Sequence, residues 1–534
     1  MKNMSTRWIV IALVGALALP ACSDDDPKQN TNEQTESDAG TTDTGDLADA
    51  SDTALDVTAQ DADPSDAADS GQTDADIDAE VDADTPPTPD NCGPAGGAAN
   101  ETFDHVYEVG PGQEYADPSE VPWESLQPGS LINIHYRPEP YASKWVIATA
   151  GTAEKPVVVR GIMDGDKRPV ITGENATTRT ELDFWNENRG VVKIGGSSNP
   201  SGQPSHIRVE NLEITGAHPS NSFVDDGGSN GTYRSNAASF YIEDGSNLTL
   251  KNCVIHGSGN GIFITANARD VLITGNHIYG NGIQGSYYEH NNYSSAVGIT
   301  FEYNRFGPLC DGCGGNNLKD RSAGLVVRYN WLEGGNRQLD LVDSGKDEVK
   351  SDPSYRDTFV YGNVLVEPAD DSGNRQIIHY GGDGSDQANY RKGTLHLYHN
   401  TVVSLRNDRN TLLRLSTDDE TAVMRNNIIY TPESSTLSLL DNTGQLDMSY
   451  NWLPEGWINS FNGSASGTVT ESDNLTGTAP GFVDLGSQDF TLASDSPARG
   501  AAGSLESEAM PVECAYEKHQ DGAARESTED LGAL

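Results

Sequence analysis

A short pattern that recurs seven times between Ile273 and Leu453 constrains this chain more than any other feature. Each copy reads apolar, two variable residues, asparagine, one variable residue, apolar. A constant core with a variable period is typical of a solenoid that carries insertions in one of its loops. Two looser copies precede the seven, at Asn211 and Asn252. The seven asparagines, separated by 28, 26, 33, 37, 27 and 24 residues, are Asn276, Asn304, Asn330, Asn363, Asn400, Asn427 and Asn451.

The residues around each asparagine predict strands. Apolar and β-branched residues alternate in short runs such as Val271–Thr274 and Leu395–Leu397, with glycine and asparagine between the runs. Helical repeats would need about 33 to 47 residues per unit and an apolar spacing of three to four. Coils of roughly 22 to 28 residues with three short strands each predict an all-β chain, folded as a parallel β-helix.

The clearest coil predicts where the corners and loops lie. Its first strand is Gly261–Thr265, its second Val271–Thr274 and its third His277–Tyr279, which places Asn276 at the corner between the second and third strands. Asparagine tolerates the left-handed backbone that a sharp corner needs. Stacked about 4.8 Å apart, the amides are expected to bond along the axis as an asparagine ladder. Long insertions between a third strand and the next first strand, at 280–290, 307–316 and 368–374, predict a cleft above the first strands.

The N-terminus reads as an export signal. Lys2 and Arg7 precede a short apolar run, which predicts a signal peptide over residues 1–21. The sequence Leu19-Pro20-Ala21-Cys22 resembles the lipobox of bacterial lipoproteins. That resemblance implies a lipid anchor in a membrane at Cys22. With Ser23 next, it implies an exported protein at the outer membrane or cell surface of a diderm bacterium.

Residues 22–98 predict a disordered linker after the lipidated cysteine. From Ser23 to Asp90 the chain holds 22 acidic residues and a single basic one, Lys28, with no aromatic residue. Such a segment cannot bury enough apolar surface to offset its ordering entropy. The β-helix domain is expected over 99–500 and a closing segment over 501–534, as a monomer. Ser23 to Asp90 supplies 21 of the 47 net negative charges, and the folded remainder is still acidic, which argues against nucleic acid as a partner.

Five further cysteines suit an exported protein, where disulfides are permitted. Cys310 and Cys313 are expected to form a local loop staple, because a zinc site would need two more ligands nearby. Cys92 and Cys514 flank the folded region and could pair, and Cys253 is the remaining one.

Counting back from the ladder asparagines places a group of polar residues on the first strands. Tyr293 and Lys319 share one offset and are predicted to be stacked neighbours about 5 Å apart. Arg321 and Asn317 share the face of Lys319 by strand alternation, and His290 leads into the preceding first strand. Later coils add further candidate substrate contacts: Arg337, Asp340, His379, Tyr380 and Arg414. Trp331 and Trp452 follow ladder asparagines and are expected to be exposed packing residues.

Lysine and arginine beside tyrosine and histidine suit the β-elimination of an acidic, uronate-bearing polysaccharide. This reaction needs a base, a cation that neutralises the carboxylate, and an acid that meets the leaving oxygen. Arg321 is predicted to lower the pKa of Lys319 by like-charge repulsion, which would favour a neutral, basic amine. The predicted catalytic residues are therefore Lys319, Arg321, His290 and Tyr293.

Segments at both ends of the predicted solenoid resemble the alginate lyase and chondroitinase B family. The segments are Pro128–Ile134, Gly151–Val159, Pro480–Val483, Ser496–Ala498 and Asp530–Ala533. The resemblance implies a right-handed parallel β-helix and a lysine base, which carries over to Lys319. For the family's arginine, both Arg321 and Arg337 are open. The family's calcium-binding cluster of acidic residues and asparagine is not recognisable, so no metal ligand is assigned and the cofactor is left open.

Three alternatives stay open. A glycoside hydrolase is one, although the Asn-Thr-Asp, Asp-Asp, Gly-His-Gly and Arg-Ile-Lys set of polygalacturonase-like enzymes does not occur here. A pectate-lyase-like site would carry an Arg-x-Pro-x-x-Arg string, which is missing too. The third is a lipid-tethered adhesin or glycan-binding module without catalysis, in which Lys319, Asp320 and Arg321 form an ordinary strand with internal ion pairs.

Overall fold

The computed structural model describes residues 92–94, 101–369 and 373–534. The predicted signal peptide, the lipidation site Cys22 and nearly all of the predicted linker lie outside these residues. Among the described residues, no helix is both long enough and apolar enough to span a bilayer.

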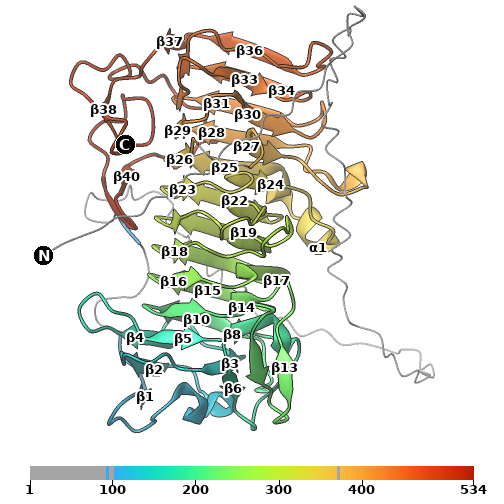
Figure 1. Cartoon of the computed structure of the whole chain (residues 1–534), viewed down its shortest axis with the longest axis vertical. Helices are drawn as coiled ribbons and strands as arrows, with labels where there is room; N and C mark the ends of the chain where they lie inside the picture. The colour runs from blue at the N-terminus through green and yellow to red at the C-terminus, as the bar shows by residue number, and fades with distance from the viewer. Residues whose placement is uncertain (1–91, 95–100, 370–372) are drawn as a thin grey trace, which may run out of the picture. The chain divides into compact units, whose positions relative to one another are not determined.

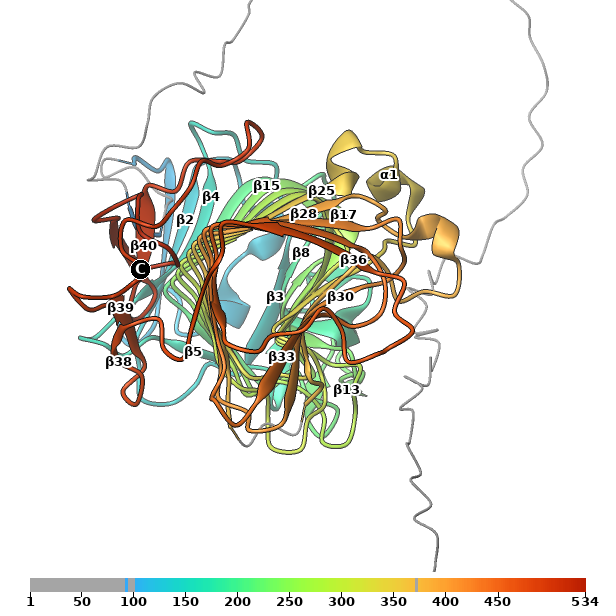
Figure 2. The ribbon, with the colours of Figure 1, turned by 90° about the horizontal axis from the view of Figure 1, so that it is seen from above.

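The described chain winds through three stacks of parallel strands in the repeating order first, second, third (Figures 1 and 2). The first stack contains β3 (Ser143–Ile147), β8 (Gly190–Ile194), β14 (Ala238–Ile242), β21 (Leu318–Asp320), β24 (Leu339–Leu341), β27 (Gln376–Tyr380), β30 (Arg409–Leu415) and β33 (Thr436–Leu440). Two long strands bend and belong to both the first and the second stack: β17 (Asn260–Thr274) and β19 (Asn292–Glu302).

The other two stacks run the full length of the described coil. The second contains β1 (His105–Val109), β2 (Ser130–His135), β4 (Val157–Ile162), β10 (Ser205–Glu210), β15 (Gly245–Lys251), β22 (Ala323–Arg328), β25 (Asp357–Tyr361), β28 (Thr394–Tyr398), β31 (Thr421–Arg425), β34 (Gln445–Ser449) and β36 (Thr468–Ser472). The third contains β5 (Val170–Thr172), β11 (Glu213–Thr215), β16 (Val254–His256), β18 (His277–Ile278), β20 (Arg305–Phe306), β23 (Trp331–Glu333), β26 (Val364–Glu367), β29 (Thr401–Ser404), β32 (Ile428–Tyr430), β35 (Trp452–Pro454) and β37 (Leu475–Gly477). The predicted parallel β-helix is confirmed.

Shorter elements lie outside the stacks. Near the N-terminal end they are η2 (Pro118–Glu120), η3 (Trp123–Ser125), β6 (Ala176–Thr178), β7 (Asp183–Phe184), η4 (Glu187–Arg189), β9 (Ser197–Asn199), β12 (Ser222–Val224) and β13 (Asn230–Thr232). Two insertions between a first and a second strand carry α1 (Asp347–Lys350), η5 (Pro353–Arg356) and η6 (Gln387–Asn389). The C-terminal segment contributes β38 (Phe482–Asp484), β39 (Asp489–Leu492), β40 (Cys514–Glu517) and β41 (Asp521–Ala524). Seen along the stack, α1 lies on one side of the coil and β38 to β40 on the other (Figure 2).

The predicted asparagine ladder is present and gains one member. Each ladder side chain donates from Nδ2 to Oδ1 of the next, from Asn276 to Asn474, at 2.9–3.0 Å. The same Oδ1 also accepts the backbone N–H of the preceding ladder asparagine. Each amide therefore satisfies buried backbone groups of its own coil and of its neighbours, which stabilises the corner.

The prediction that the ladder asparagines themselves adopt the left-handed backbone is wrong. The left-handed residue is the one before each of them: Gly275, Tyr303, Tyr329, Gly362, His399, Asn426, Tyr450 and Asp473. That residue makes the turn, and the next one directs its amide into the corner. Asn211 and Asn252 occupy the turn position, with φ of 61° and 48°. Cys253 takes the ladder position of its coil, because its N–H donates to Oδ1 of Asn276 at 2.9 Å.

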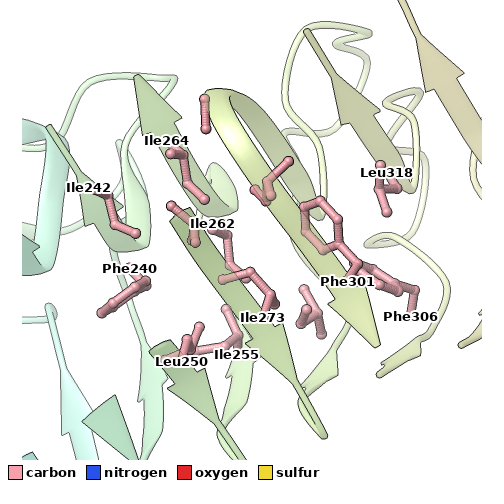
Figure 3. Packing of buried hydrophobic residues seen from close by; sticks show 14 of the residues in the cluster. Phe240, Ile242, Leu250, Ile255, Ile262, Ile264, Ile273, Phe301, Phe306 and Leu318 are labelled. Atoms are coloured by element: carbon pink, nitrogen blue, oxygen red, sulfur yellow. The ribbon is translucent and has the colours of Figure 1, made fainter. Parts of the chain in front are cut away.

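Alternate residues of the strands in the three stacks fill the interior of the coil. Figure 3 shows Ile262, Ile264 and Ile273 of β17 packed with Phe301 and Leu318 from the next two coils. These side chains are at most 2% exposed. Because inward and outward residues alternate along a strand, this apolar core directs the intervening residues of the first stack toward the outside.

The C-terminal segment covers the outer side of the third stack. The ring of Phe490 stacks on Trp331 at 5.5 Å, and Leu492 packs near Trp452. Both tryptophans are at most 1% exposed, so the prediction that they are exposed is wrong. A disulfide from Cys92 to Cys514 joins the two ends of the described chain. Cys310 and Cys313 form the predicted loop staple, and Cys253 is a buried free thiol.

Candidate active site

One outward row of side chains crosses six coils of the first stack. Backbone pairing places Phe263, Tyr293, Lys319, Asp340, His379 and Arg414 at successive steps. The predicted neighbours Tyr293 and Lys319 are therefore confirmed as paired positions. Asp340, His379 and Arg414 continue the same line. Consecutive members lie one strand spacing apart, so their polar ends reach each other.

Lys319 lies in the middle of the row between two carboxylates. Its Nζ is 3.0 Å from Oδ2 of Asp340 and 2.6 Å from Oδ2 of Asp383. Burial acts to lower the pKa of Lys319, but the attraction of the two carboxylates outweighs it and the pKa is raised. The expected downward shift beside Arg321 is therefore wrong, because the carboxylates oppose the repulsion from Arg321. Lys319 is an ammonium group in this arrangement.

Arg321 lies two residues further along the chain and contacts the same carboxylate. Its Nη2 is 2.9 Å from Oδ1 of Asp383, and its Nε donates to Oη of Tyr293 at 3.0 Å. A further N–H donates to the carbonyl of Asp343. Although burial acts against the charged form, Tyr293 and the carboxylates of Asp383 and Asp343 hold the pKa of Arg321 well above its ordinary value. Two cations thus converge on one carboxylate.

From the sequence, the segment His379–Asp383 is interpreted as cleft wall or substrate contact, or equally as a structural turn, but the contact of Asp383 with Lys319 is not predicted. Asp383 lies in the insertion between β27 and β28, that is, between a first and a second strand. The sequence predicted insertions only between third and first strands. The carboxylate of Asp383 is nevertheless brought onto Lys319 from 64 residues away in the chain. A glycine on each side of this aspartate, Gly382 and Gly384, is the only local signal that could have pointed to it.

A network of hydrogen bonds, here called the circuit, joins the row to the loop that carries Asp383. Asp340 Oδ1 lies 2.7 Å from Nδ1 of His379, and Nε2 of His379 lies 2.9 Å from Oγ of Ser416. The N–H of Gly382 donates to that Oγ at 2.8 Å. The order serine, histidine, aspartate is that of a nucleophilic triad. Here, however, the Ser416 hydroxyl is bonded to the loop that carries Asp383, so the circuit positions that loop.

His290 is buried beneath this arrangement in its neutral form. Its side chain is 2% exposed, and burial lowers its pKa to about 3. Nδ1 accepts the N–H of Asn316 at 2.9 Å, so the ring proton of the neutral form is on Nε2. With its one lone pair engaged, His290 is poorly placed to act as a base. Its ring meets Tyr293 edge to face at 5.5 Å and supports that phenol.

The remaining candidate residues divide between the outer face and the interior. Asn317 was expected on the outer face, but its side chain forms a second ladder inside the coil, accepting from Asn291 at 2.8 Å. Tyr380 is fully buried, because strand alternation turns it inward beside His379. Arg337 donates to Gln376 at 2.7 Å at the edge of the row. Arg414 is paired with His379 and half-buried.

A buried ion pair supports the strand that carries the two cations. Asp320, between Lys319 and Arg321, is fully buried and accepts from Ser294 at 2.6 Å. Arg391 is also fully buried and approaches Asp320 at 3.5 Å, with further bonds to backbone carbonyls of neighbouring turns. Since these groups have no access to water, they fix the path of β21 and with it the spacing of the cations.

A cavity of about 530 Å³ opens beside the row, between the insertions that precede the first strands. Its lining includes Tyr287, Asn336 and the Cys310–Cys313 staple. The side chain of Tyr287 is 67% exposed. Asn336 connects the cavity to the row, because it donates to Asn316, which in turn donates to Asp340 at 2.7 Å. None of the described residues that line this cavity belongs to a first strand, so the cleft expected above the first strands stays a prediction.

Calcium does not fit the carboxylates around Lys319. Within the described residues, no three His, Cys, Asp or Glu side chains are grouped so that they could hold a metal ion. The carboxylates of Asp340 and Asp383 both pair with the ammonium of Lys319. We therefore derive no step through a metal.

His290 gives the stability of the protein a defined pH dependence. Its folded pKa of about 3 lies below the unfolded value of about 6.5, so the unfolded chain binds the proton more tightly. We expect the contribution of His290 to be complete above pH 6.5 and to fall by about 1.4 kcal/mol per pH unit on acidification below it. The free energy of unfolding, measured in urea at several pH values, checks this.

His290→Asn is the matched variant, because Oδ1 of asparagine can accept the same N–H. Its stability should decline less steeply than that of the wild type between about pH 6.5 and 4. Other buried histidines titrate in both proteins and cancel in the comparison. Parallel curves would show that His290 is not the group responsible.

Comparison with known proteins agrees with the fold. Residues 170–352 match the family model described as a right handed beta helix region, so the chain folds as a right-handed parallel β-helix. No curated protein sequence matches this chain.

Several solved structures are similar to this chain. The pectate lyase Pel9A is 12% identical with a TM-score of 0.44, covering 81% of this chain and 96% of its own. An alginate lyase from Paenibacillus sp. strain FPU-7 is 11% identical with a TM-score of 0.39, covering 65% and 93%. A GH136 lacto-N-biosidase from Eubacterium ramulus is 13% identical with a TM-score of 0.37, covering 70% and 68%.

Proposed function

We propose that this protein is a carbohydrate-active enzyme that cleaves an acidic, uronate-containing polysaccharide by β-elimination. The observation that carries the proposal is the pair of cations on the outer face of the first stack. Lys319 and Arg321 jointly bind one carboxylate in a protein whose net charge is −47. A uronate carboxylate has the same charge and geometry as the Asp383 group they hold in this structure.

The two cations suit the neutralisation step of the elimination. Removal of the proton beside a uronate carboxylate places negative charge on that carboxylate, and two preorganised cations stabilise it. Because its pKa is raised, Lys319 serves as a charged clamp in this scheme and not as the base first expected from the sequence. Arg321 is the second cation of this clamp, and it contacts Tyr293, the remaining candidate for proton transfer.

We assign the proton transfer to Tyr293, whose Oη lies 3.0 Å from Nε of Arg321. As a phenolate beside a guanidinium, Oη would take the proton from C5, and the electron pair would form the C4–C5 double bond. The C4–O bond then breaks, and the phenol returns the proton to the leaving oxygen. The exposed Tyr287 beside the adjoining cavity offers a ring face to a neighbouring sugar.

A glycoside hydrolase is the second enzyme candidate, since two carboxylates lie close together. Its general acid would need a raised pKa. Burial acts to raise the pKa of both Asp340 and Asp383, but Lys319 pulls each of them below its ordinary value. Both groups are therefore ionised, which favours elimination over hydrolysis.

The test is incubation of the protein with alginate, pectate, chondroitin and heparinoid chains. We expect at least one chain to give the ultraviolet absorbance of an unsaturated uronate, which only elimination produces. New reducing ends without that absorbance would identify a hydrolase. Binding on a glycan array without any cleavage would identify an adhesin or glycan-binding module. With a lipid at Cys22, as the sequence predicts, either activity would operate at the cell surface.

A further inference from the structure

The carboxylate of Asp383 occupies the place that the proposed substrate carboxylate needs. Its Oδ2 lies 2.6 Å from Nζ of Lys319 and 3.2 Å from Nη2 of Arg321, and its Oδ1 lies 2.9 Å from the same Nη2. The side chains of the two cations are only 6% and 10% exposed, whereas that of Asp383 is 22% exposed. Asp383 thus lies between the cations and the solvent.

The loop around Asp383 is held in this position by specific contacts. The N–H groups of Asp383 and Gly384 donate to Oδ1 of Asp343 at 2.8 and 3.2 Å. Ser416 accepts the N–H of Gly382, and Oη of Tyr390 donates to the carbonyl of Gly384. A Cβ on Gly382 would come within 2.1 Å of the Tyr390 ring, so the close packing of this loop requires glycine.

Lys319 and Arg321 together form a seat for one charged group, which Asp383 fills in this structure. The group that fills this seat has to be an anion. When Asp383 leaves, Lys319 keeps Asp340 at 3.0 Å and Arg321 keeps Asp343 at 3.7 Å, but one negative charge is lost beside two buried cations, and the hydroxyls of a neutral sugar cannot replace it. Exchange of one carboxylate for another keeps the charge of the site unchanged. Asp383 is also the most exposed group of the three, so it can leave toward water and be solvated there.

We propose that Asp383 is an internal competitor that reserves the Lys319–Arg321 seat for an anionic group of the substrate. In the free protein it fills the seat, and a uronate carboxylate displaces it on binding. Asp383 therefore determines specificity in two ways. It excludes neutral glycans, and it lowers the apparent affinity for acidic ones to the intrinsic affinity multiplied by the fraction of time the seat is empty. The inference rests on the proposed function for the identity of the substrate, but not for the seat itself.

The first test is rescue by formate, the smallest carboxylate, in Asp383→Ala. We expect formate to raise the melting temperature of this variant in a saturable way and to leave that of the wild type unchanged. Asp386→Ala removes an exposed carboxylate from the same loop and is the matched control, expected to show no response. Asp383→Asn keeps the side-chain shape and replaces the alanine variant should the latter not fold. Absence of any formate effect in both Asp383 variants would overturn the inference.

The second test measures affinity by calorimetry with oligomers of galacturonate and guluronate. Without the internal competitor, Asp383→Asn should bind the preferred oligomer about tenfold or more tightly than the wild type. Equal or weaker binding by the variant would overturn the inference. Formate rescue combined with no elimination on any chain would leave the anion seat in place and reject only the proposed lyase reaction.

Discussion

Lys319→Met is expected to lower kcat/KM on the cleaved polysaccharide by about 10²- to 10⁴-fold, because it removes one of the two cations that stabilise charge on the substrate carboxylate. The change also leaves Asp340 without its ammonium partner. Initial rates of ultraviolet absorbance give kcat and KM separately. Since the charge develops mainly in the transition state, we expect most of the loss in kcat.

Lys193→Met is the matched control for this variant. Lys193 is also buried on the first stack, paired with Glu243 at 2.7 Å, but it lies outside the catalytic cluster. Both variants lose an ion-paired ammonium from the same stack, so we expect similar effects on folding. Circular dichroism and the melting temperature measure these effects. A large loss of activity in Lys193→Met at full folding, or none in Lys319→Met, would contradict the proposed site.

Asn330→Ala is expected to destabilise the protein by about 4 kcal/mol, one of the largest losses available to a single side chain. Asn330 is fully buried and donates to the carbonyls of Phe301 and Arg328, both at 2.8 Å. It also bonds to the asparagines above and below it in the ladder. Alanine would leave several of these buried groups without partners. The midpoint and slope of urea denaturation measure the effect.

Asn474→Ala tests whether the loss comes from position within the ladder. Asn474 is the last member and only half-buried, and it accepts from Asn451 at 3.0 Å. Its replacement removes contacts to one neighbour, so we expect a loss of about 1 kcal/mol. Similar losses of stability in Asn330→Ala and Asn474→Ala would show that stacking of asparagines along the axis adds little to the free energy of unfolding.

The repeated coil was predictable because its determinants are local. Seven successive coils carry the same asparagine at the same distance from their apolar residues, so a single sequence shows the pattern seven times. The pairing of Tyr293 with Lys319 followed from the same count. The left-handed residue was assigned one position too late, since glycine, tyrosine, histidine and asparagine all fill it and no residue type marks it.

The inward or outward direction of individual side chains was harder to predict. Asn317 and Tyr380 lie next to outward residues and were placed with them, but each is turned into the coil. A shift of one residue reverses the face of a strand residue. The number of residues between a strand position and the ladder asparagine does not reveal such a shift, because a corner can gain or lose a residue.

By itself, the sequence determined the parallel coil, the ladder and the part of the first stack where cationic side chains gather, because these depend on spacing that repeats along the chain. Only the tertiary structure decided the charge of Lys319, the neutral state of His290 and the contact of Asp383 with Lys319. Protonation depends on which charges lie within a few ångströms. In a solenoid those neighbours come from other coils and their insertions, dozens of residues away, where spacing along the sequence carries no information about distance.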